Sequence, residues 1–111
     1  MKIVQIEKSG IICITINGHT NEVLTRDDEN SIWQTLKEDK HHLLFDLGAL
    51  EYLRSAELRV ILDVVKEMKR KNGKVVLCTL NKYVKETFEV SGVGAFLPIA
   101  DSVESGIKAL S

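Results

Sequence analysis

Ser55 is the residue of this sequence best placed for reversible chemistry. It follows Arg54 at the start of the longest helical pattern, where a serine hydroxyl commonly accepts a hydrogen bond from a free helix N–H. A phosphate on that hydroxyl would lie in the positive field of the helix N-terminus, with Arg54 beside it as a counter-ion. The pattern alone leaves two interpretations open for Ser55, which are ordinary helix capping and a phosphorylation switch.

The other side chains that catalyse reactions or bind metals are dispersed along the chain. His41 and His42 are neighbours, and in a strand their side chains would point to opposite faces and could not share one ion. His19 has no metal-ligating neighbour at a suitable spacing. Cys13 and Cys78 each lie inside an apolar run and are expected to be buried, unpaired thiols. The sequence therefore predicts no metal site, no cofactor and no enzymatic activity.

The formal net charge of −1 hides a polarised distribution. Residues 54–85 carry nine basic and three acidic side chains, a local charge of +6, whereas the segments on either side are acidic. A partner guided by charge would meet this middle segment first. Few aromatic residues are interleaved for base stacking, and several of the lysines crowd one helix end, where cations are favoured locally. Nucleic acid is therefore not expected as a partner.

Hydrophobic periodicity predicts strands that alternate with helices. The turn at Lys8-Ser9-Gly10 joins the first two strands into a hairpin, and Asn72-Gly73 ends the longest helix. That helix is expected to bury one stripe made of Leu58, Ile61, Leu62, Val65 and Met68. The predicted strands are 2–7, 11–16, 42–47, 75–80 and 96–99, and the predicted helices are 27–40, 55–71, 82–90 and 102–110.

This order of elements predicts an α/β fold in one domain over residues 1–111. The N-terminal hairpin should join a mostly parallel mixed sheet of about five strands with about four helices, since right-handed crossovers make successive strands parallel. No apolar run approaches the ~20 residues that cross a bilayer, and Glu7 interrupts any signal peptide. The chain is expected to be a whole cytoplasmic protein with no membrane insertion.

Several segments resemble the STAS domain family, which is shared by bacterial anti-sigma factor antagonists and the cytoplasmic tails of sulfate transporters. Residues 43–47 followed by 50–62 are similar to the family's strand, loop and switch helix. The family's loop usually reads Asp-Ser-Ser-Gly-Leu, and a partner kinase phosphorylates its first serine, on which Ser55 falls. The hairpin over residues 3–18 and the segments 72–77 and 96–104 also resemble the family.

The chain departs from the family pattern at four positions. Arg54 replaces the usual aspartate, Ala56 the second serine and Glu57 the glycine, while Asn21 replaces an acid after the hairpin. Two acids are thereby lost near the surface that faces the kinase in the family, and Glu57 adds bulk where glycine permits close approach.

The resemblance implies a non-enzymatic regulatory domain of the anti-sigma factor antagonist type. It would dock an anti-sigma factor with serine kinase activity through the loop and helix start at Ser55, and phosphorylation of Ser55 would switch that contact. The residues expected to bind the partner are Asn21, Arg54, Ser55, Ala56, Glu57 and Arg59.

Two alternatives stay open, and the oligomeric state is left undecided. The chain could be an unphosphorylated STAS scaffold subunit of a signalling or membrane lipid-transport complex. It could also be a small-ligand-binding α/β domain, because open sheets of this class bind ligands at the carboxyl ends of their strands. Asp46 and Glu51 flank that edge, although loop capping and solvated charge explain both carboxylates equally well.

Overall fold

The fold is a five-stranded mixed sheet with four helices in the described part of the chain. The computed structural model describes residues 2–8, 10–17, 25–36, 42–51, 53–90, 92 and 97–110. In chain order the elements are β1 (Lys2–Lys8), β2 (Ile11–Asn17), α1 (Arg26–Leu36), β3 (His42–Asp46), α2 (Ser55–Arg70), β4 (Lys74–Cys78), α3 (Lys82–Val90), β5 (Ile99–Ala100) and α4 (Val103–Leu110). The predicted α/β class is confirmed.

The strands lie in the order β1-β2-β3-β4-β5 across the sheet. β1 and β2 pair antiparallel, and every following pair is parallel. Gly10, with φ of 79°, supplies the positive φ that the hairpin turn requires. The predicted hairpin is therefore confirmed, and a helix lies in the connection between each pair of parallel strands.

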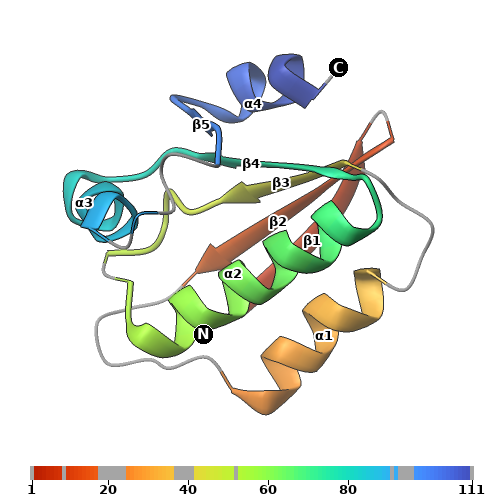
Figure 1. The fold of residues 1–111 in the computed structure, drawn as a ribbon, viewed down its shortest axis with the longest axis horizontal. Coiled ribbons are helices and arrows are strands. Elements are labelled where there is room, and N and C mark those ends of the chain that lie inside the picture. The colour runs from red at the N-terminus through yellow and green to blue at the C-terminus, as the bar shows by residue number, and fades with distance from the viewer. Residues whose placement is uncertain are drawn as a thin grey trace.

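Two apolar cores lie on opposite faces of the sheet. Helices α1 and α2 cover one face and α4 the other (Figure 1). β3 serves both cores, since Leu43 and Phe45 pack beneath α1 and α2 whereas Leu44 packs beneath α4. All three side chains are fully buried, as expected of a short apolar run covered on both faces.

Helix α2 is rotated from the stripe that its periodicity predicted. Its buried residues are Glu57, Val60, Ile61, Val64, Val65 and Met68, whereas Leu58 and Leu62 are only half-buried. The prediction was correct for Ile61, Val65 and Met68 and wrong for Leu62, whereas Leu58 packs against the core with only part of its side chain buried. Apolar residues occupy more of the circumference of α2 than one sheet can cover, so periodicity could not select the buried side.

The C-terminal end of α2 is closed by two backbone hydrogen bonds. The Gly73 N–H donates to the Met68 carbonyl at 2.7 Å, and the Asn72 N–H donates to the Lys69 carbonyl at 3.0 Å. Asn72 adopts φ of 62°, which is the left-handed conformation of a Schellman cap. The helix thus ends at the predicted place, with asparagine in the position that glycine more often fills.

The last two strands and one cysteine differ in detail from the predictions. β4 ends at Cys78 because Thr79 turns the chain with φ of 63°. β5 contains only Ile99 and Ala100 and begins after Pro98, which lacks the N–H that a strand needs. Cys78 is buried as expected, whereas Cys13 is half-buried.

Candidate functional site

Asn81 is one of the residues that hold the loop leading into α2. The Asn81 amide donates to the carbonyls of Leu50 and Glu51 at 3.1 and 3.0 Å. The Asn81 Oδ1 also accepts the Val84 N–H at 2.8 Å and so caps α3. Asn81 therefore fixes the loop after β3 to the start of α3, a few residues before Ser55.

Ser55 is the first residue of α2 and is exposed to solvent. Arg54 occupies the N-cap position with φ of −90° and ψ of 166°, and no side chain makes a capping hydrogen bond there. The structure therefore contains no helix capping by the Ser55 hydroxyl, which was one of the two interpretations of this serine. The hydroxyl faces solvent beside the free N–H groups of the first turn.

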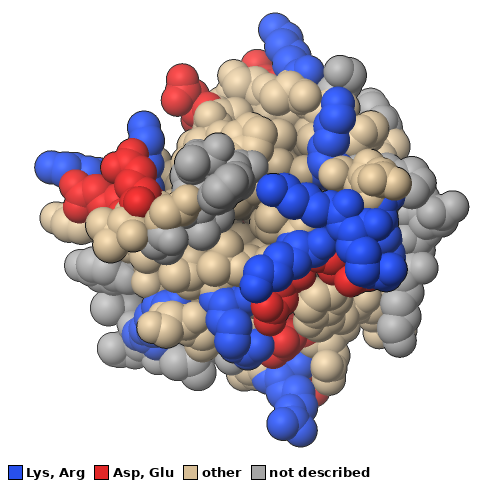
Figure 2. Space-filling view, in the orientation of Figure 1, with Lys and Arg blue, Asp and Glu red and all other residues tan. Residues whose placement is uncertain are grey.

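A shallow hollow of about 270 Å³ borders Ser55 on the exposed side of α2. We call this area the α2 surface, and its lining residues are Ser55, Leu58, Arg59, Leu62, Asp63 and Lys66. The half-buried leucines form its apolar part, and side chains of both charges surround them. In the space-filling view, lysine and arginine side chains gather over α2 with acidic ones between them (Figure 2).

Arg59 links α2 to α1 across the α2 surface. Its guanidinium lies 3.5 Å from the Glu29 carboxylate and 3.4 Å from the Asp63 carboxylate. The other Glu29 oxygen accepts a 3.4 Å hydrogen bond from the Trp33 indole. The Arg59 side chain is still 59% exposed, so these contacts orient its guanidinium without removing it from solvent. It is available to a partner carboxylate.

Glu57 points into the protein instead of toward the α2 surface. It is 2% exposed, and among the described residues it is the one charged side chain that is buried. Its Oε2 atom has no hydrogen-bond partner, although the carboxylate lies in the first turn of α2, where the helix dipole favours negative charge. Glu57 could touch a partner only by leaving this buried position.

The structure places most of the predicted partner-binding residues together. Arg54 is half-buried, and Ser55, Ala56 and Arg59 are exposed at the start of α2. Asn21 lies outside the described residues. Sequence reasoning missed Leu58 and Leu62, which it assigned to the core. The available signal was the excess of apolar positions on α2 over what one sheet face can bury.

Other kinds of site receive little support from the described residues. They contain no group of three or more side chains that could hold a metal ion. None of their helices is both long and apolar enough to cross a membrane. Asp46 Oδ1 accepts the Gly48 N–H at 3.0 Å, which is the loop capping that the sequence suggested as one explanation of this carboxylate.

Comparison with other proteins places this geometry in a family. The STAS domain model matches residues 2–106. The chain is 32% identical over 109 residues to BtrV of Bordetella bronchiseptica, which bears the name of an anti-sigma factor antagonist, and the match covers 98% of this chain and 94% of BtrV. It is 25% identical over 105 residues to an anti-sigma F factor antagonist of Paenibacillus polymyxa, covering 91% of this chain and 87% of that protein.

A solved structure agrees with this fold at low sequence identity. The crystal structure of an anti-sigma factor antagonist from Mycobacterium paratuberculosis superposes with a TM-score of 0.86 and 16% identity, covering 98% of this chain and 92% of that one. The family match spans nearly the whole chain, and the two folds agree over nearly the whole of both chains. This chain belongs to the STAS domain family.

Proposed function

We propose that residues 1–111 act as one non-enzymatic regulatory domain of the anti-sigma factor antagonist type, docking a protein partner through the α2 surface. The observation that carries this proposal is an exposed Ser55 beside Leu58 and Leu62, which the fold leaves half-buried. Covering the remaining apolar area of two leucines would contribute on the order of 1–2 kcal/mol to binding. The names of the two relatives support a partner of the anti-sigma factor class.

Phosphorylation of Ser55 would act on this contact through charge. The exposed hydroxyl accepts a phosphate without displacing packed side chains, and the helix N-terminus tolerates the added negative charge. The same phosphate would place about two negative charges on the α2 surface near Asp63 and would have to be desolvated by a docking partner. The domain would therefore fold in both forms and bind its partner, a cytoplasmic anti-sigma factor with serine kinase activity, in the unphosphorylated one.

The test compares two aspartates, each placed in the first turn of a helix. Ser55→Asp is expected to keep the fold and to weaken binding to the host's purified anti-sigma factor kinase by about tenfold or more, as measured by calorimetry. Ser105→Asp is the matched control, since Ser105 is also exposed at a helix start but lies on α4, on the opposite face of the sheet. Equal binding by both variants would place the docking surface elsewhere.

A second measurement separates the switch from a permanent scaffold. The wild-type domain is incubated with the same kinase and ATP, and phosphate is located by mass spectrometry. Phosphate on Ser55 supports the switch. Weak binding by Ser55→Asp without any label on Ser55 in the wild type would support the scaffold alternative, in which the α2 surface docks a partner but is never modified.

A further inference from the structure

Ser55, Arg59 and Asp63 lie along one side of α2. They are spaced four residues apart in the helix, and all three line the hollow on the α2 surface. Side chains four residues apart on a helix are neighbours, with about 5–6 Å between their Cβ atoms. The Arg59 guanidinium can therefore reach forward to Asp63, as it does at 3.4 Å, or back to position 55.

The contacts that Arg59 makes in this structure hold it weakly. Its guanidinium lies 3.5 Å from Glu29 and 3.4 Å from Asp63, which are long distances for charge-assisted hydrogen bonds. The side chains of Arg59 and Asp63 are 59% and 40% exposed, and ion pairs this open to solvent contribute little to stability. A stronger anion within reach would therefore displace both carboxylates.

A phosphate on Ser55 would be such an anion. Transfer of the terminal phosphoryl group of ATP to the Ser55 oxygen releases ADP and the hydroxyl proton. It leaves a group with about two negative charges at neutral pH and three strong acceptor oxygens. A guanidinium binds a phosphate through two parallel hydrogen bonds, and an anion four residues before the cation is the favourable order on a helix.

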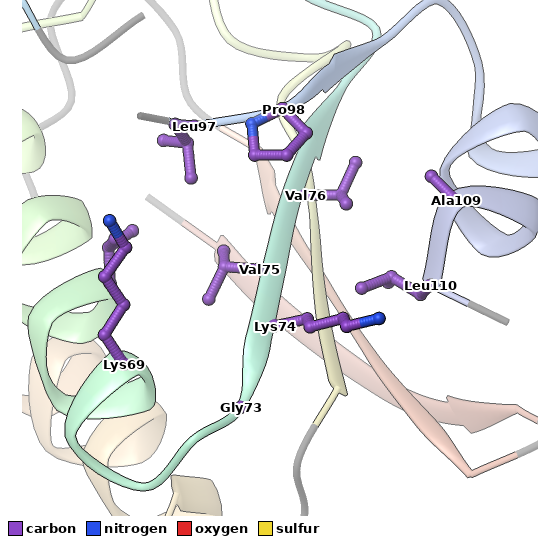
Figure 3. A pocket seen from close by; sticks show the side chains of 10 residues that line it. Lys69, Gly73, Lys74, Val75, Val76, Leu97, Pro98, Ala109 and Leu110 are labelled. Atoms are coloured by element: carbon purple, nitrogen blue, oxygen red, sulfur yellow. The ribbon is translucent and has the colours of Figure 1, made fainter. Parts of the chain in front are cut away.

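Arg59 is better placed for this phosphate than the other basic side chains of α2. Lys66 follows about three turns after Ser55, about 16 Å along the helix at about 1.5 Å per residue. Lys69 lies still further along and lines a separate groove of about 220 Å³ beside β4 (Figure 3). Arg54 directly precedes Ser55, and adjacent residues at a helix start do not face each other.

We propose that phosphorylated Ser55 captures Arg59, which leaves Glu29 and Asp63, and that this exchange breaks the ion pair between α2 and α1. The inference rests on the phosphorylation of Ser55 in the proposed function and names the residue that receives the phosphate. Glu29 would keep the hydrogen bond from the Trp33 indole but lose its cation. Phosphorylation would thus add negative charge to the α2 surface and also withdraw the exposed arginine from a partner carboxylate.

The experiment uses protein synthesised with the phosphate already on Ser55, so that no kinase is needed. Urea unfolding of the two forms is compared in the wild type and in Arg59→Gln. Phosphate should lower the unfolding equilibrium constant by about fivefold or more in the wild type relative to its effect in Arg59→Gln. Lys66→Gln is the matched control, because Lys66 is an exposed cation of the same surface that lies out of reach. An equal effect of phosphate in wild type and Arg59→Gln would overturn the proposal.

The indole of Trp33 tests whether Arg59 leaves Glu29. Its N–H donates to Glu29 at 3.4 Å, so its NMR resonance should move on phosphorylation in the wild type and stay in place in Arg59→Gln, which has no cation to lose. A stabilising phosphate with an unmoved indole resonance would overturn the exchange. Neither measurement involves the partner, so capture of Arg59 with unchanged partner binding would overturn only the proposed docking, and lost partner binding without capture would overturn only this inference.

Discussion

At the scale of single residues, two ionisable side chains, Glu57 and Cys78, are buried in the fold. Glu57 keeps a carboxylate oxygen without a hydrogen-bond partner at 2% exposure, and the first turn of α2 offsets part of that cost through its free N–H groups. Burial of Cys78 in the core beneath α4 raises the pKa of its thiol, and the hydrogen bond with Thr79 opposes this shift only in part. Burial therefore disfavours the thiolate form of Cys78, which is the reactive form of a cysteine.

The raised pKa of Cys78 predicts a loss of stability at alkaline pH. Because the folded protein holds the thiol proton more tightly than the unfolded chain, the contribution of Cys78 is fully present below the ordinary thiol pKa. It is lost as pH rises through the raised pKa of the folded state. Urea unfolding from about pH 7 to about pH 10 should therefore show a steeper fall for wild type than for Cys78→Ala. If the free energy of unfolding fell equally with pH in both proteins, the Cys78 thiol would not be the cause of the fall.

At the scale of elements, Asn81 connects two parts of the fold with one side chain. Its oxygen caps α3, and its nitrogen holds two carbonyls of the loop after β3. This loop precedes Arg54 and Ser55, so its position sets where α2 begins. The start of the α2 surface thus depends on a residue that follows β4.

Substitution of Asn81 separates the two roles. Asn81→Ala should lower the free energy of unfolding by about 2 kcal/mol, of which the lost cap accounts for about 1 kcal/mol and the loop carbonyls left without a donor for the rest. Asn81→Ser keeps a capping oxygen and loses the amide donor without adding a charge. Chemical denaturation should place Asn81→Ser between wild type and Asn81→Ala, and equal destabilisation by both variants would count against a capping role.

The elements differ in how far the sequence determines them. The hairpin and the end of α2 could be predicted because Gly10 and Asn72-Gly73 act locally through backbone conformation. The rotation of α2 could not, since Leu58 and Val60 are equally apolar and only packing against the sheet decides which is buried. The inward position of Glu57 was missed for the same reason.

The candidate site shows the same difference between residues that local sequence could place and contacts that only the tertiary structure sets. Ser55 and Arg59 could be placed from the helix start and the family resemblance. The ion pairs of Arg59 with Glu29 and Asp63 and the loop anchor at Asn81 depend on contacts between distant segments. Periodicity in one sequence carries no information about such pairs.

At the scale of the whole molecule, the sheet joins the two cores. Leu43 and Phe45 belong to the core beneath α1 and α2, and Leu44 between them belongs to the core beneath α4. Loss of β3 would therefore expose apolar surface on both faces at once. The two cores should behave as one cooperative unit.

Cooperativity can be measured with the single tryptophan of the chain. Trp33 is half-buried and packs against the core beneath α1 and α2, so its fluorescence reports on that core, while far-UV circular dichroism reports on all four helices. Urea transitions followed by the two methods should coincide, as in two-state unfolding of small domains. A separate circular dichroism transition at lower urea would show that α4 detaches on its own.

Helix α2 fixes the distance between Ser55 and Lys69, which are both exposed. Its 16 residues correspond to about 24 Å of nearly straight rod at about 1.5 Å per residue, with Ser55 at one end and Lys69 near the other. A single protein that contacts both residues must bridge this span, and its second contact forms at a high effective concentration once the first has formed. Two individually weak contacts at the two ends of α2 would then give strong avidity, and a charge added at Ser55 would remove this gain by breaking one of them.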